Sequence, residues 1–291
     1  MSFINIKGEG ASATISTFGA ELFSLKNSVG LEYLWQGDMK YWGDRSPTLF
    51  PYIGRLCGGK YIYEGEEYFL PIHGFAPKSE FEVKESGEDY VTMVLRSSDE
   101  TLKAYPFDFE FRITYKICDS TLQVNCEVEN LSNKTMFFGY GGHPGINVPL
   151  DEGLAFEDYC LEFEGGHSPR RIVFSENKFV DGTAPYTLND RNQIPLTHSL
   201  FDDDAVVLKD SGHRVTLKSD KGTHGVEAYY PDIDYIGFWQ ADHTDAPYVC
   251  IEPWSSLPSN EGSVTILDKQ DNLISLDSGK TYKNSWYLRL F

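Results

Sequence analysis

Two neighbouring segments with strict alternation of apolar and polar residues constrain the fold of this chain most. Every second residue from Phe109 to Ile117 (FEFRITYKI) is apolar, and the residues between them are polar. The segment from Leu122 to Glu129 (LQVNCEVE) repeats the pattern after the short connection CDST. Because successive side chains of a β-strand point to opposite faces, this pattern predicts two amphipathic strands joined by a tight turn.

The rest of the chain favours the same class of structure. Shorter alternating runs cover residues 90–95, 213–217, 263–267 and 285–290, and residues 199–208 suggest a short helical turn before a strand. No long segment has helical periodicity, and no low-complexity linker or internal repeat divides the chain. Aromatic residues, which suit pleated surfaces, make up 14% of the sequence. We therefore expect an all-β fold, a large antiparallel β-sandwich of two extensive sheets with few short helices, and residues 1–291 forming a single domain.

Charge and cysteine content narrow the possible partners and the compartment. The net charge of −19 disfavours binding to nucleic acid or to an anionic membrane, but it leaves a small neutral ligand unaffected. The five cysteines are odd in number and none has C-x-x-C spacing, so we expect no disulfides or zinc ligands and a reducing compartment, the cytoplasm. No apolar stretch approaches the roughly 20 residues of a membrane helix, and the N-terminus does not resemble a signal peptide.

A carboxylate stands at the end of an apolar segment near the C-terminus. Glu252 directly follows YVCI and precedes Pro253 and Trp254. Burial at such a place disfavours the charged form and raises the pKa of the carboxyl group towards the range of a general base. A salt bridge to a nearby arginine or lysine is the alternative interpretation of Glu252.

Two histidines and one arginine lie in segments rich in glycine and proline. His143 is flanked by glycines in YGGHPGIN, which indicates either a close backbone approach at a site or a plain glycine loop. His73, in PIHGFAP, occupies a strand end, where a histidine is usually a structural hydrogen-bonding residue. Arg55 lies in FPYIGRL.

These residue types suit proton transfer on a neutral, polyol-like molecule. His73, His143 and Glu252 lack the H-x-H or H-x-x-x-H spacing that would support a two-histidine, one-carboxylate metal site. The sequence also has no G-x-S-x-G nucleophile motif, no P-loop and no dinucleotide-binding motif. We therefore expect neither a metal nor a cofactor.

In this order, the segments around Arg55, His73, His143 and Glu252 resemble the aldose 1-epimerase (galactose mutarotase-like) superfamily, and its LacX-like branch most. The resemblance begins near GAEL, residues 19–22, and continues to CIEPW, residues 250–254. It implies a β-sandwich of this length and a cofactor-free isomerase. Such enzymes interconvert the α and β anomers of a free aldose by opening and closing the sugar ring, which requires a positioned acid and base.

The resemblance also implies a role for each matching residue. Glu252 corresponds to the general base, His143 to the general acid, and His73 to the histidine that polarises the sugar near its ring oxygen. Arg55 corresponds to the arginine that binds sugar hydroxyl groups. The sugar-binding aspartate is expected in FDDDAVVL, with Asp204 preferred and Asp203 as the alternative. Phe75 and Trp254 are expected to form apolar walls of the pocket.

The motifs depart from those of the best-characterised galactose mutarotases. Those proteins have a glycine at the position of Phe75 and an asparagine at that of Gly142, which argues against galactose as the substrate. A hexose-6-phosphate 1-epimerase is one alternative, with Arg45, Lys78, Arg170 and Arg171 as candidate phosphate contacts. A non-catalytic sugar-binding or sensor protein is the other.

The mechanism implied by the resemblance predicts how the candidate residues are arranged in space. We expect His143 and Glu252 on opposite sides of a sugar-sized cleft that His73 and Arg55 also line. The protein is expected to be a monomer or a homodimer with a small sugar as its partner.

Overall fold

Two large antiparallel sheets dominate the computed structural model, which describes all residues from 1 to 291. The nine strands of the first sheet, in pairing order, are β17 (Gln193–Pro195), β14 (Tyr159–Phe163), β19 (Arg214–Ser219), β20 (Val226–Tyr229), β25 (Thr281–Leu290), β10 (Thr121–Asn130), β9 (Phe109–Cys118), β8 (Tyr90–Arg96) and β7 (Glu82–Ser86). The eight strands of the second are β16 (Val180–Pro185), β15 (Arg170–Phe174), β18 (Val206–Lys209), β21 (Tyr235–Trp239), β22 (Tyr248–Trp254), β12 (Gly141–Gly142) and β4 (Thr48–Leu49), with β13 (Gly145–Asn147) also paired to β22. The predicted β-sandwich is confirmed.

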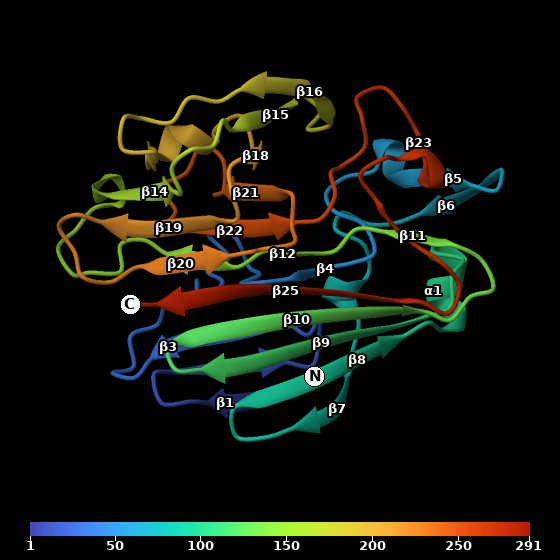
Figure 1. The fold of residues 1–291 in the computed structure, drawn as a ribbon, viewed down its shortest axis with the longest axis horizontal. Helices are drawn as coiled ribbons and strands as arrows, with labels where there is room; N and C mark the ends of the chain where they lie inside the picture. Colours follow the sequence, from blue (N-terminus) through green and yellow to red (C-terminus); the bar gives the residue numbers. More distant parts are fainter.

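Three smaller sheets accompany the two large ones. They are the sheets β1 (Phe3–Lys7), β2 (Ala11–Ser16), β3 (Leu22–Asn27); β5 (Lys60–Tyr63), β6 (Glu66–Phe69), β23 (Thr265–Ile266); and β11 (Met136–Phe138), β24 (Ile274–Leu276). Helical structure is confined to α1 (Asp99–Ala104) and to 3₁₀ turns at Cys57–Gly59, Ala76–Lys78, Phe156–Asp158, His198–Phe201 and Leu267–Lys269. No helix has the length and apolar character needed to cross a membrane. Figure 1 shows the β15–β16 hairpin and strand β7 at opposite edges of the molecule.

The alternating segments form the hairpin that their pattern predicts. Strands β9 and β10 pair antiparallel from Cys118 opposite Thr121 to Phe109 opposite Asn130. Their apolar residues are buried and their polar residues are partly exposed. The short helical turn predicted within residues 199–208 is also present, directly before β18.

One local prediction is inaccurate. The alternating run 263–267 forms only the short strand β23, because a turn at Gly262 precedes it and a 3₁₀ turn begins at Leu267. The one α-helix, α1, agrees with the expected scarcity of helices, although its position was not predicted. It begins where the side chain of Ser98 accepts a hydrogen bond from the backbone N–H of Thr101.

The two large sheets approach closely at the glycine-rich segment before His143. A Cβ atom on Gly142, in β12, would lie only 2.6 Å from Cζ2 of Trp286 in β25. Gly145, in β13, is similarly close to Trp42, with 3.1 Å between its ideal Cβ and Cζ3 of that indole. These glycines thus allow a dense contact between backbone and indole rings on both sides of His143.

We predict that Gly142→Ala destabilises the protein by about 1–3 kcal/mol, the usual cost of overpacking a core. Gly165→Ala is the matched control, since its added methyl group would meet only the end of the Asn192 side chain, at 3.3 Å. Urea unfolding of the two variants measures the difference. Equal stabilities would contradict the close contact between Gly142 and Trp286.

Candidate active site

Strand β22 places three neighbouring side chains on one face of the second sheet. Its alternate residues Val249 and Ile251 belong to the main hydrophobic core. Cys250, Glu252 and Trp254 occupy the intervening positions and therefore point to the opposite face. There Trp254 packs with side chains of β4 and β18. The two-residue period of the strand thus brings Glu252 to the wall of a cavity.

His143 lies in the turn between β12 and β13 and is enclosed by indole rings. Its imidazole packs against Trp42 with ring centroids 5.0 Å apart and against the edge of Trp239 at 5.7 Å. Only 7% of His143 is exposed. This burial lowers the pKa of His143 to about 4, so its imidazole is neutral at pH 7.

The structure brings His143 and Glu252 into direct contact. Nε2 of His143 lies 3.2 Å from Oε2 of Glu252, and the indole N–H of Trp254 donates to the same oxygen at 3.1 Å. No arginine or lysine forms a salt bridge with Glu252, so the alternative interpretation of this residue as a salt-bridge partner is wrong. Burial raises the pKa of Glu252 well above its usual value, and the Trp254 hydrogen bond opposes that shift. Two atoms of the pair, Nδ1 of His143 and Oε1 of Glu252, are buried without a hydrogen-bond partner.

The contact contradicts the expectation that His143 and Glu252 face each other across a cleft. At a separation of 3.2 Å no sugar ring fits between the two groups. They lie side by side on the same wall instead, because His143 is carried by the turn that joins β12 and β13, both of which pair with β22.

His73 is held in a strained backbone conformation next to this pair. Its φ angle is +65°, a left-handed value that costs a non-glycine residue about 1–2 kcal/mol. Nδ1 of His73 accepts a hydrogen bond from the backbone N–H of Gly54 at 3.2 Å, so the proton of the neutral ring resides on Nε2. The ring lies perpendicular to that of His143 at 5.5 Å. Desolvation, together with the proximity of His143 and Arg55, lowers the pKa of His73 to about 3.

These side chains line a cavity of about 270 Å³, close to the lower limit for small-molecule pockets. Its aromatic residues are Trp42, Phe174, Trp239 and Trp254, and its polar residues are Asp44, Arg55, His73, His143, Lys178, Asp204 and Glu252. The structure therefore brings together six of the candidate residues in one cavity: Arg55, His73, His143, Asp204, Glu252 and Trp254.

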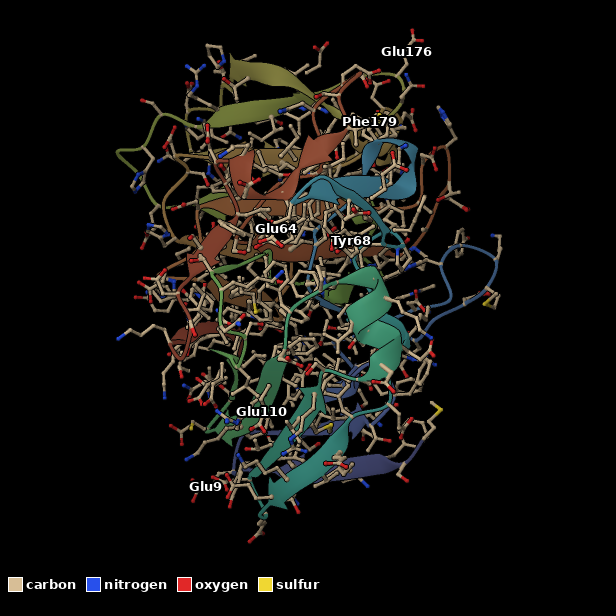
Figure 2. All side chains as sticks on the ribbon, turned by 90° about the vertical axis from the view of Figure 1, so that its right-hand side faces the viewer. Glu9, Glu64, Tyr68, Glu110, Glu176 and Phe179 are labelled. Atoms are coloured by element: carbon tan, nitrogen blue, oxygen red, sulfur yellow. The ribbon has the colours of Figure 1, made fainter.

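The two candidate aspartates, Asp204 and Asp203, lie in different places relative to the cavity. Oδ2 of Asp204 lies 3.8 Å from the guanidinium of Arg55 and 4.0 Å from Nζ of Lys178, inside the cavity. Asp203 does not line the cavity, and its carbonyl oxygen accepts a hydrogen bond from Lys178 at 2.8 Å. Lys178 comes from the β15–β16 connection, whose residues Glu176 and Phe179 are labelled at the end of the molecule in Figure 2.

Phe75 does not form a wall of the cavity, contrary to expectation. Its ring stacks on Phe109 at a centroid distance of 5.9 Å and meets the edge of Phe50 at 6.0 Å, so it belongs to the aromatic core beneath. The left-handed conformation of His73 and Gly74 turns the chain between the two side chains. His73 therefore reaches the cavity while Phe75 points inward.

Several lining residues were not identified from the sequence. Trp42, Trp239 and Lys178 lie in segments without a recognisable motif, and only the fold brings them to the cavity. None of the four predicted phosphate contacts lines it. Lys78 pairs with Asp44 at 3.2 Å, and the guanidinium of Arg45 covers the ring of Phe23 at 3.7 Å.

Comparison with known proteins identifies the family. The model of the aldose 1-epimerase family matches residues 2–271. The plasmid-encoded protein LacX of Lactococcus lactis is 34% identical, and the alignment covers 97% of both chains. A galactose mutarotase related enzyme from Lactobacillus acidophilus superposes with a TM-score of 0.94 at 32% identity, over 100% of this chain and 97% of that one. A galactose mutarotase-like protein from Lactobacillus casei does so with a TM-score of 0.93 at 31% identity, over the full length of both. The chain belongs to the aldose 1-epimerase family.

Proposed function

We propose that this protein is an aldose 1-epimerase that interconverts the α and β anomers of a free aldohexose. The observation that carries the proposal is the buried contact between His143 and Glu252 in the wall of a small cavity. His73 and Arg55, which the family resemblance assigns to sugar binding, line the same cavity.

The side-by-side arrangement of the pair suits the chemistry of an anomeric carbon. Ring opening removes a proton from the hydroxyl oxygen on C1 and adds one to the ring oxygen. Both oxygens are bonded to C1, so an acid and a base that serve them have to lie next to each other. The 3.2 Å separation of His143 and Glu252 meets this requirement better than opposite walls of a cleft.

A single proton held by the pair is sufficient for the whole cycle. The lowered pKa of His143, about 4, and the raised pKa of Glu252 both favour the state in which the single proton of the pair resides on Glu252. Transfer of that proton across the 3.2 Å contact creates a carboxylate and an imidazolium. Glu252 then accepts the proton of the C1 hydroxyl while His143 protonates the ring oxygen. The open-chain aldehyde forms, and the pair returns to its starting state.

The other polar side chains bind and orient the sugar. His73 carries its proton on Nε2 and donates a hydrogen bond from there to the sugar near its ring oxygen. Arg55 and Asp204 supply a donor and an acceptor for hydroxyl groups. The indole of Trp254, fixed by its hydrogen bond to Glu252, offers an apolar face to the C–H groups of the ring.

An uncharged sugar fits this cavity better than a sugar phosphate. Its two cations, Arg55 and Lys178, both face the carboxylate of Asp204 at 3.8 and 4.0 Å. A phosphate would need to displace Asp204 from them and would also meet Asp44 and a strongly acidic protein. Because Asp204 neutralises Arg55 and Lys178 only in part, these side chains can still form hydrogen bonds with neutral hydroxyl groups.

The five free cysteines agree with a reducing compartment, and we propose the cytoplasm.

We predict that the protein accelerates anomer exchange of free aldohexoses and that Glu252→Gln lowers the rate by about 10²–10⁴-fold, because one proton-transfer group is lost. NMR exchange spectroscopy on glucose, galactose and their 6-phosphates measures both. Glutamine matches the size and neutrality of a protonated glutamate, so a circular dichroism spectrum like that of the wild type is the control for folding.

Two results would replace this proposal by one of the alternatives. Exchange with the phosphates alone would identify a hexose-6-phosphate 1-epimerase. Calorimetric binding of a sugar without exchange above the buffer rate would identify a non-catalytic binding or sensor protein. Equal rates for the wild type and Glu252→Gln would remove Glu252 from the mechanism.

We predict that Trp254→Phe moves the alkaline limb of the pH–rate profile to higher pH. The pair is competent while it holds one proton, so activity declines below about pH 4, as His143 becomes protonated, and again as pH rises through the raised pKa of Glu252. The Trp254 N–H stabilises the carboxylate, so its removal raises the pKa of Glu252 further. Trp239→Phe is the control, because it removes no hydrogen bond to Glu252 and should leave the alkaline limb at the same pH. If both variants shifted the alkaline limb equally, the role of the Trp254 N–H would be contradicted.

We predict that His73→Asn lowers kcat/KM by about tenfold, as expected for one lost hydrogen bond of roughly 1.4 kcal/mol. Asparagine tolerates the φ angle of +65°, so the substitution removes the imidazole without adding backbone strain. His198→Asn is a matched control, because His198 is also partly buried but lies outside the cavity. Steady-state polarimetry compares the two variants, and an unchanged kcat/KM for His73→Asn would assign this residue a structural role only.

A further inference from the structure

Strand β22 places a third potential metal ligand beside the acid–base pair. Cys250 lies two residues before Glu252 on the same face of the strand. Ligand atoms of His143, Cys250 and Glu252 all lie within 4.8 Å of one another, and all three residues are buried. The proposed mechanism makes no use of the thiol of Cys250.

Two polar atoms of this cluster lack a partner in the protein. Oε1 of Glu252, a residue with 1% exposure, and Nδ1 of His143, with 7% exposure, accept or donate no hydrogen bond. Such buried, unsatisfied groups are uncommon, and an ion or a water molecule is one explanation for them. The atoms Nε2 and Oε2, 3.2 Å apart, have about the separation of two ligands on one tetrahedral zinc ion, and the unpartnered Oε1 belongs to the same carboxylate and is available to that ion.

The charges of the cluster match a divalent cation. One thiolate, one carboxylate and one neutral imidazole neutralise a charge of +2, so the buried complex has no net charge and avoids the large cost of burying an isolated ion. A sulfur and an imidazole nitrogen favour zinc or cobalt over magnesium or calcium, which prefer oxygen ligands. The cluster therefore favours a zinc-like ion through the chemistry of its ligand atoms as well as through its charge.

We propose that His143, Cys250 and Glu252 form a binding site for one zinc-like divalent cation, and that this ion inhibits the enzyme. The second half of the proposal rests on the proposed function of the His143–Glu252 pair; the binding half does not. The ion occupies the imidazole and carboxylate atoms that proton transfer requires, and it competes with the sugar for the same place in the cavity.

The path of the ion follows from the position of the three residues. His143 and Glu252 line the cavity, whereas Cys250 does not, so the ion enters through the cavity and its fourth position faces back into it.

Cobalt(II) provides a direct test, because a thiolate bound to it gives a characteristic charge-transfer absorption. We expect the metal-free, full-length protein to bind one equivalent of Co²⁺ with this absorption, and Cys250→Ala to lose it. Cys126→Ala is the matched control, since Cys126 is another fully buried, unpaired cysteine but lies on β10 outside the cluster. Both variants keep the exposed Cys118, which controls for binding at the surface.

Inhibition is measured separately by anomer exchange during zinc titration. We expect zinc to suppress exchange in the wild type and in Cys126→Ala. Cys250→Ala should need at least about 10–100-fold more zinc for the same effect, since loss of a residue that merely supports a ligand already costs this much. Absence of the Co²⁺ absorption in the wild type, or its persistence in Cys250→Ala, would overturn the proposed site. The wild-type measurement does not depend on whether any variant folds. Co²⁺ binding to a protein without anomerase activity would leave the site intact and reject the proposed function alone.

Discussion

The contact between Glu252 and His143 depends on the pairing of β22 with its neighbours in the second sheet. Because β22 runs through the middle of that sheet, its two faces belong to different environments, and its side chains alternate between them. One face supplies Val249 and Ile251 to the core, and the other presents Glu252 to the cavity. A slip of one residue would exchange these sets and bury a carboxylate among aliphatic side chains. Core packing and site geometry are therefore enforced by the same register.

Low polarity around the site sets the protonation states of its residues. Indole rings surround His143, and this environment penalises charge on either member of the pair. The imidazole is kept neutral and the carboxyl group retains its proton to a higher pH. A pair of titratable groups whose pKa values are pushed apart in this way is a frequent property of acid–base sites.

Much of the architecture could be predicted from the sequence, because strand periodicity is a local property. The β9–β10 hairpin followed from alternation alone, and the positions of Arg55, His73, His143 and Glu252 followed from their motifs. The contact of His143 with Glu252 could not be predicted, because it depends on how β12 and β13 pair with β22. Phe75 was misplaced for a related reason: two consecutive left-handed residues at His73 and Gly74 reverse the direction of its side chain. Lys178 reaches the cavity through a hairpin connection that carries no motif.

The indole rings of the cavity wall also have an optical consequence. Trp42, Trp239 and Trp254 line the cavity and make up three of the five tryptophans of the protein. A neutral ligand that replaces water against these rings changes the polarity sensed by most of the intrinsic fluorophores. The protein therefore carries its own emission probe of cavity occupancy, and an unlabelled sample can report binding of a sugar that itself absorbs no visible or near-ultraviolet light.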